Sequence, residues 1–179
     1  MIHKFTVDLL DPKSIKKCIK ELKEYQKSFR DKIDVFAKRL AEIGVSEAKI
    51  HITAYNAIDT GTLLDSLIVR QGKSYGSKVK YYVVADCGYA CYVEFGTGTN
   101  GSNSPYPFPL PRGARRWRYN SGSTVHETQD GRIGWFYPAD DGHWYFTEGQ
   151  PSRPFMGQTA LALEVQVESV AREVFGYGI

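Results

Sequence analysis

Apolar residues recur in alternating steps of three and four positions near the start of the chain, which predicts a long amphipathic helix from Asp11 to Ile43. Asp11 is suited to cap this helix and Pro12 to occupy its first position, while Gly44 is expected to end it. The rhythm is interrupted once, where it falls on Gln26. The apolar stripe consists of Ile15, Ile19, Leu22, Phe29, Ile33, Phe36, Leu40 and Ile43.

Charged residues flank this stripe at helical spacing, as in the pairs Lys20 with Glu24 and Asp34 with Lys38. At 1.5 Å per residue the predicted helix is roughly 48 Å long, whereas a small domain measures about 30 Å across. One small domain cannot easily cover so long a stripe, so we expect part of it to pack against another chain.

In the middle of the chain, the sequence pattern predicts shorter helices and strands. Residues 46–58 mix helical and alternating signals and are interpreted as a short helix. Asp59-Thr60-Gly61 is a turn, and Thr60 or Thr62 is expected to cap a short helix that includes Leu63, Leu64 and Leu67. Strand character follows at residues 67–69 and 79–85, and residues 89–95 continue as a strand or a short helix.

The second half of the chain combines a loop, hairpins and a helix. Residues 96–111 are rich in Gly, Ser, Asn and Pro, which predicts a long loop. Aromatic runs at 117–119, 135–137 and 144–146 are separated by turn residues and predict hairpins. A helix is predicted from Phe155 to about Phe175. The fold class is therefore α+β, with a long N-terminal helix and a C-terminal helix packed on a central antiparallel sheet. We expect a single domain spanning residues 1–179, with an inserted loop and hairpin from Asn100 to Gly149.

Composition narrows the functional classes. The chain has 179 residues, 42% of them hydrophobic, and a formal net charge of +3, which alone does not indicate a nucleic-acid partner. No apolar run is long enough to span a membrane, and we expect no membrane partner. Charges at Lys4 and Asp8 argue against a signal peptide. The three cysteines, Cys18, Cys87 and Cys91, are expected to be reduced thiols made in a cytoplasm.

No motif indicates catalysis, a metal or a cofactor. Cys87 and Cys91 lack the further ligands that structural zinc requires. Asp140-Asp141-Gly142-His143 is read as a turn between two aromatic strands rather than as an acid–base group. The glycines from Gly96 to Gly101 lack the lysine of a phosphate-binding loop. We therefore expect a protein with no catalytic, cofactor-binding or metal-binding residues.

Two features are candidates for contacts. Arg112, Arg115, Arg116 and Arg118 surround Trp117, a composition that suits phosphate contacts or a subunit interface. Glu94 lies inside an apolar run. If it is buried it needs a partner, for which an arginine of the same or an adjacent subunit is the natural candidate; the alternative is a solvent-facing position on a strand.

Three segments in order resemble a known family. They are Asp59-Thr60-Gly61-x-Leu63-Leu64-x-Ser66-Leu67, Tyr89-Ala90-x-Tyr92-Val93-Glu94-Phe95-Gly96-Thr97 and Gln150-Pro151-x-x-Pro154-Phe155-Met156-x-x-x-Ala160-Leu161. We call them the first, second and third motifs. Together they are similar to the tail-completion and head–tail joining proteins of long-tailed phages. The 100–149 stretch is longer than that family leads us to expect between the last two motifs.

The resemblance implies a structural virion protein of a phage or prophage, assembled in the host bacterial cytoplasm, without enzymatic activity. It implies a ring of identical copies that completes the tail or joins it to the head connector, with connector and tail-tube proteins as neighbours and DNA in the lumen as a candidate partner. Candidate subunit-interface residues are Phe29, Phe36, Glu94, Arg116, Trp117, Trp135 and Trp144. The alternative is a cell-wall glycan hydrolase or glycan-binding module that uses the aromatic segment 117–148.

Overall fold

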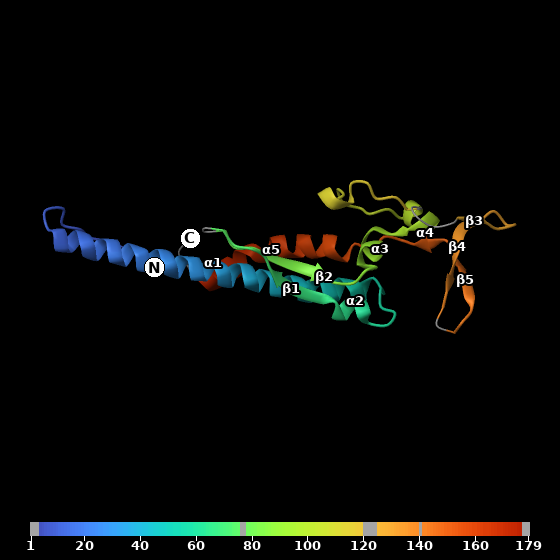
Figure 1. Cartoon of the computed structure of the whole chain (residues 1–179), viewed down its shortest axis with the longest axis horizontal. Coiled ribbons are helices and arrows are strands. Elements are labelled where there is room, and N and C mark those ends of the chain that lie inside the picture. Colours follow the sequence, from blue (N-terminus) through green and yellow to red (C-terminus); the bar gives the residue numbers. More distant parts are fainter. Residues whose placement is uncertain (1–3, 76–77, 120–124, 140, 177–179) are drawn as a thin grey trace. The chain divides into compact units, whose positions relative to one another are not determined.

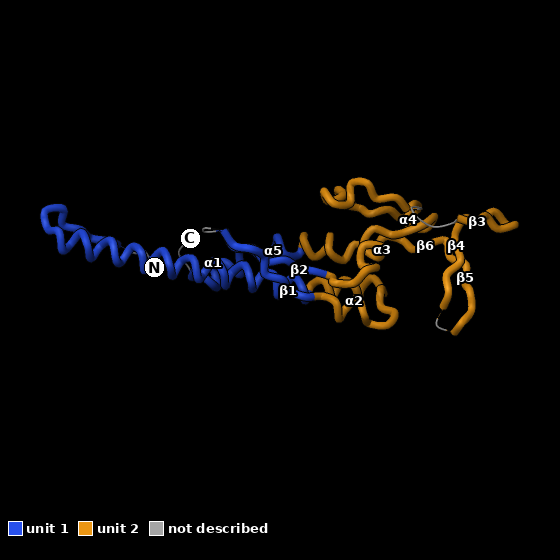
Figure 2. Tube along the Cα trace, in the orientation of Figure 1, with its two compact units in different colours: residues 1–46, 68–84, 162–179 blue, residues 47–67, 85–161 orange. Residues whose placement is uncertain are grey.

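The computed structural model describes residues 4–75, 78–119, 125–139 and 141–176. Figure 1 shows helices and antiparallel strands, so the α+β class is confirmed. The chain forms two compact units, coloured in Figure 2: residues 1–46, 68–84 and 162–179 make unit 1, and residues 47–67 and 85–161 make unit 2.

The first helix, α1, runs from Pro12 to Ala54 and is longer than predicted. Its start is as expected, because the Asp11 carboxylate accepts hydrogen bonds from the backbone N–H groups of Lys13 and Ser14 at 2.9 and 3.2 Å. The helix continues through Gly44 to Ala54, so most of the short helix predicted at 46–58 is part of α1. At 1.5 Å per residue its 43 residues span roughly 65 Å.

The prediction that Gly44 ends the helix is wrong. A Cβ at this buried position would lie 2.7 Å from Cγ2 of Val83 and 3.1 Å from Cδ1 of Leu163, so Gly44 permits close packing inside unit 1. The helix ends instead at Asn56, which has a left-handed φ of 51°. The backbone N–H of Ala57 donates to the carbonyl of Ile52, and that of Asn56 donates to Thr53, which is a Schellman ending.

In unit 1 the strands β1 (Leu67–Gln71) and β2 (Tyr81–Ala85) pair as a hairpin, near the predicted strand positions. The hydroxyl of Tyr81 donates to the Asp34 carboxylate at 3.2 Å. Lys38 forms an ion pair of 3.7 Å with Glu42 rather than the predicted pair with Asp34.

The helix α5 (Phe155–Phe175) has the predicted bounds. Within unit 1 its last turns pack against α1, where the Phe175 ring lies 5.6 Å from Phe29 and 5.8 Å from Phe36, measured between ring centroids. Arg39 and Glu173 form an ion pair of 2.8 Å between the same helices. The C-terminal helix thus covers only part of the apolar stripe of α1.

Unit 2 holds the small helices α2 (Thr62–Asp65), α3 (Ala90–Phe95) and α4 (Gly98–Asn103) and the short 3-10 turn η1 (Arg112–Ala114). The helix α2 is confirmed, but Gly61 is its N-cap rather than a threonine. Residues 89–95 form a helix, and α4 lies within the segment predicted as a continuous loop. The buried core of unit 2 includes Ile52, Leu63, Val93 and Phe155.

The aromatic hairpins form a three-stranded sheet of β3 (His126–Glu127), β4 (Ile133–Pro138) and β5 (Trp144–Thr147). The pair Phe136 with Phe146 lies in register, and their ring centroids are 5.3 Å apart. The run 117–119 is not a strand, which corrects the first predicted aromatic strand. The strand β6 (Gly149–Gln150) then leads toward α5.

Candidate functional site

A buried carboxylate connects the second and third motifs inside unit 2. Glu94, on α3, is only 5% exposed. Its two carboxylate oxygens accept hydrogen bonds from the backbone N–H groups of Met156 and Gly157, at 2.8 and 2.9 Å. These N–H groups belong to the first turn of α5 and have no partner within the helix, so Glu94 acts as its N-terminal cap. The expected arginine partner is therefore replaced by the positive end of a helix.

The backbones of the two motifs are also joined directly. The Ser152 hydroxyl donates to the Glu94 carbonyl at 2.7 Å, and the Arg153 N–H donates to the Val93 carbonyl at 2.9 Å. Gly96 has a φ of 80°, and a Cβ there would lie 2.7 Å from the backbone nitrogen of Ser152. Only glycine meets both conditions, so Gly96 in the second motif is explained by the close approach of the third.

Burial and hydrogen bonding act in opposite directions on this carboxyl group. Burial raises the pKa of Glu94 and outweighs the lowering by the N–H groups of Met156 and Gly157 and by a hydrogen bond from Tyr106. Burial and the charge of Glu94 raise the pKa of Tyr106 to about 12, so Tyr106 stays a hydrogen-bond donor at neutral pH.

Aromatic rings pack on Phe95, the residue next to the cap. The Phe95 ring lies 4.9 Å from that of Tyr106 and 5.2 Å from that of Trp117, between centroids. The indole N–H of Trp117 donates to the Gly96 carbonyl at 3.1 Å. Trp117 therefore packs against the second motif inside unit 2.

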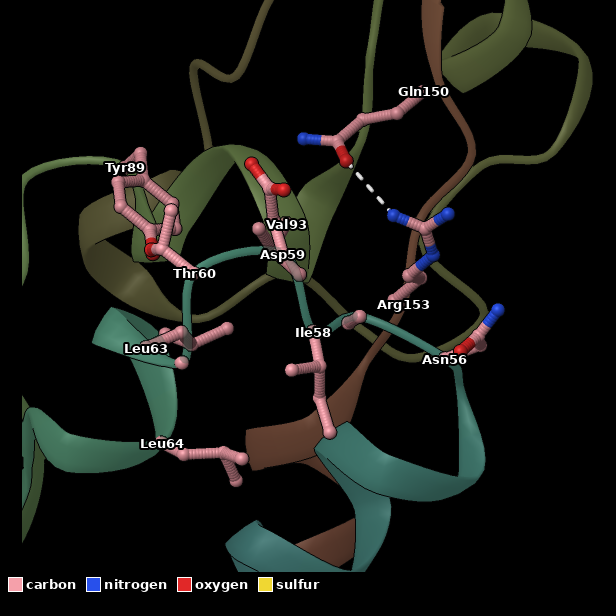
Figure 3. A pocket seen from close by; sticks show the side chains of 12 residues that line it. Asn56, Ile58, Asp59, Thr60, Leu63, Leu64, Tyr89, Val93, Gln150 and Arg153 are labelled. Atoms are coloured by element: carbon pink, nitrogen blue, oxygen red, sulfur yellow. Dashed lines mark hydrogen bonds between the residues drawn. The ribbon is translucent and has the colours of Figure 1, made fainter.

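All three motifs line one pocket of about 410 Å³ in unit 2, shown in Figure 3. The first motif contributes residues 59–61, Leu63 and Leu64, the second Tyr89 and Val93, and the third Gln150 and Arg153. The Arg153 guanidinium donates to the Gln150 side-chain oxygen at 3.0 Å. The pocket thus combines apolar side chains with polar groups of the first and third motifs.

The remaining candidate residues are distributed over both units. Phe29 and Phe36 lie on α1, and Trp135 and Trp144 lie on β4 and β5. Trp144 is 66% exposed, and Arg116 is also exposed, whereas Phe36, Trp117 and Trp135 are half-buried. The structure brings Glu94 and Trp117 into one cluster, while Trp135 and Trp144 lie on the separate sheet.

The predicted turn between the aromatic strands is present in its described part. The Asp141 carboxylate accepts hydrogen bonds from the Tyr145 hydroxyl at 2.7 Å and from the His143 backbone N–H at 3.0 Å, and these contacts lower the pKa of Asp141. Asp140 lies outside the described residues. No group of three or more His, Cys, Asp or Glu side chains is placed to hold a metal ion among the residues that the structure describes. Within the same ranges, no helix is long and apolar enough to cross a membrane.

The match to a family model supports a structural component of a phage tail. Residues 16–96 match the model of the family described as "Bacteriophage HK97-gp10, putative tail-component". The resemblance predicted from the sequence is thereby confirmed for a span that includes the first motif and the second motif up to Gly96. No curated protein and no solved structure matches the chain.

Two residues of the site were not singled out from the sequence. Tyr106 and Ser152 contact Glu94 from segments that carry no periodic pattern. Their spacing from Glu94 in the chain gives no signal, because the contacts depend on how α3, the loop after α4 and the start of α5 come together.

Proposed function

We propose that the protein is a ring-forming subunit that completes the phage tail or joins it to the head connector. Its partners are then other copies of itself and the neighbouring connector and tail-tube proteins, in a virion assembled in the host cytoplasm. The proposal rests on the family match and on one structural observation, the large amount of apolar surface that each unit leaves exposed.

Apolar side chains are exposed on both long helices. On α1, Ile19, Leu22 and Phe29 are between 44% and 47% exposed, and on α5 Val165 is 79% exposed. Only two large side chains, Ile52 and Phe155, are fully buried among the described residues. Soluble monomers rarely leave long apolar stripes uncovered, so these faces are suited to contact other chains.

A closed ring of identical subunits can cover these exposed apolar faces. When one face of a subunit binds a different face of the next copy, the same contact repeats until the ring closes. Exposed aromatic residues strengthen such contacts, because tryptophan and tyrosine are enriched among the residues that dominate binding energy. Trp144 on β5 is the most exposed tryptophan and is therefore a candidate anchor.

The experiment is to introduce Trp144→Glu or Val165→Glu into the virion protein. Both side chains are exposed, so the variants should remain folded by circular dichroism while the yield of infectious particles falls about tenfold or more. The control is Gln129→Glu, which adds the same charge at an exposed turn and should leave the yield unchanged. Normal yields from folded Trp144→Glu and Val165→Glu variants would refute the proposed interfaces.

Ring formation has its own measurement. Negative-stain images and the mass in solution are measured for the protein alone and with disrupted particles. Both should show closed rings. The Val165→Glu variant should not be incorporated into them. Rings that form equally well with this variant would place the contact elsewhere.

A second candidate is a glycan-binding module, favoured by the aromatic sheet. Phe136, Tyr145 and Trp144 are each at least 46% exposed there, and exposed rings suit sugar stacking. Binding of wild-type protein to cell-wall glycan that disappears in Trp144→Glu, with particle assembly intact, would favour this function over the ring.

A further inference from the structure

A row of positive charges follows one face of α1. The cationic stripe consists of Lys13, Lys16, Lys20, Lys23, Lys27 and Arg30. These residues are spaced by three, four, three, four and three positions, and residues three or four apart lie on the same face of a helix. At 1.5 Å per residue the stripe extends over roughly 26 Å. At 100° per residue, it lies beside the apolar residues Ile15, Leu22 and Phe29 on a neighbouring face of α1.

Few ion pairs compensate the charge of the cationic stripe. All six side chains are exposed. Lys20 has a carboxylate neighbour, Glu24, at 3.9 Å. The other five have no ion-pair partner among the described residues of the chain. Like charges one turn apart repel each other and weaken a helix, so the stripe is unfavourable for the isolated protein and suits an anionic partner.

The residue types identify the kind of partner. Five of the six stripe residues are lysines, which are depleted in the cores of protein–protein interfaces. Lysine is, however, an effective point-charge contact for phosphate. Duplex DNA carries one negative charge per about 1.7 Å of its axis, so a straight cationic row meets phosphates along its whole length.

We infer that the cationic stripe of α1 binds the phosphate backbone of duplex DNA without reading its sequence. This inference goes beyond the assembly role and does not require a ring, since the stripe belongs to a single helix of one subunit. A phosphate-only contact has a defined signature, which is an affinity that falls steeply with salt and does not depend on base sequence.

The test compares two variants of the full chain that lose the same charge. K13Q/K16Q/K23Q/K27Q removes four unpaired lysines of the stripe, and K49Q/K73Q/K78Q/K80Q removes four exposed lysines elsewhere. Glutamine and lysine have similar helix propensity, so both variants should keep the wild-type circular dichroism spectrum. Binding to a labelled random 30-base-pair duplex is followed by fluorescence anisotropy between 50 and 200 mM NaCl.

We expect the stripe variant to bind DNA about tenfold or more weakly at low salt, and the slope of log affinity against log salt to decrease by about three to four. The control variant should bind within about threefold of wild type. Absent binding by the wild-type protein, or equal losses in the two variants, would overturn the inference. Displacement of DNA by poly-L-glutamate at equal charge concentration would also overturn it, because the stripe would then fit an acidic protein surface. Ring formation by the stripe variant is measured separately, so failure here leaves the proposed assembly role unaffected.

Discussion

The Glu94 carboxylate accepts a 2.9 Å hydrogen bond from the backbone N–H of Gly157, although the two residues are 63 positions apart in the chain. A helix N-terminus usually takes its cap from the residue just before it. Here the residues before α5 include Pro151 and Pro154, and a side chain of α3 supplies the cap instead. The start of the C-terminal helix is therefore tied to the second motif, and the stability of unit 2 should depend on this contact.

The first prediction concerns Glu94→Gln. Glutamine has nearly the same shape but only one acceptor oxygen, so one of the two N–H groups of α5 loses its partner. We expect the free energy of unfolding to fall by about 1–3 kcal/mol in urea denaturation. Glu127→Gln is the control, because Glu127 is exposed and its loss should change stability by less than about 0.5 kcal/mol. Equal stability of the two variants would show that Glu94 does not cap α5.

The second prediction follows from the raised pKa of Glu94. The folded protein holds the proton of this carboxyl group more tightly than the unfolded chain, whose pKa is near the ordinary value of 4.5. The stability linked to the proton on Glu94 is therefore fully present below that value and is lost as pH rises through the folded pKa. The stability of the wild type relative to Glu94→Gln should decrease as pH rises above 4.5. Urea unfolding of both proteins across this range measures the difference between their free energies of unfolding. An increase in this difference with pH would contradict the prediction.

The third prediction concerns the packing of unit 1 at Gly44. Alanine favours helix more than glycine does, yet its Cβ would lie 2.7 Å from the stiff side chain of Val83. We expect Gly44→Ala to destabilise the protein by about 1–3 kcal/mol. Thermal unfolding should show recovery in Gly44→Ala/Val83→Ala, because the second change makes room for the added methyl group. Gly113→Ala, where no atom lies within 4 Å of the added Cβ, is the control and should be neutral. A stabilised Gly44→Ala protein would contradict the close approach.

The predictions from the sequence were most accurate where the deciding interactions are local. The start of α1 follows from Asp11 and Pro12, because a cap and a first-turn proline act on their own neighbours. The bounds of α5 follow from the proline-containing segment before it and the helical pattern after it. The strands at 135–137 and 144–146 follow from aromatic residues separated by turn residues.

Tertiary structure decided the features that depend on residues far apart in the chain. Gly44 is compatible with a helix end, but its role is set by Val83 and Leu163, which pack against it. A left-handed Asn56 ends α1 instead. For a buried Glu94 the charge alone predicts an arginine partner. A helix N-terminus can neutralise a buried carboxylate as well, and which one does so is determined by the elements that the fold brings together. The sequence by itself determined the long helices, the aromatic strands and the motifs, since these depend on near neighbours, whereas the junction of the motifs depends on long-range packing.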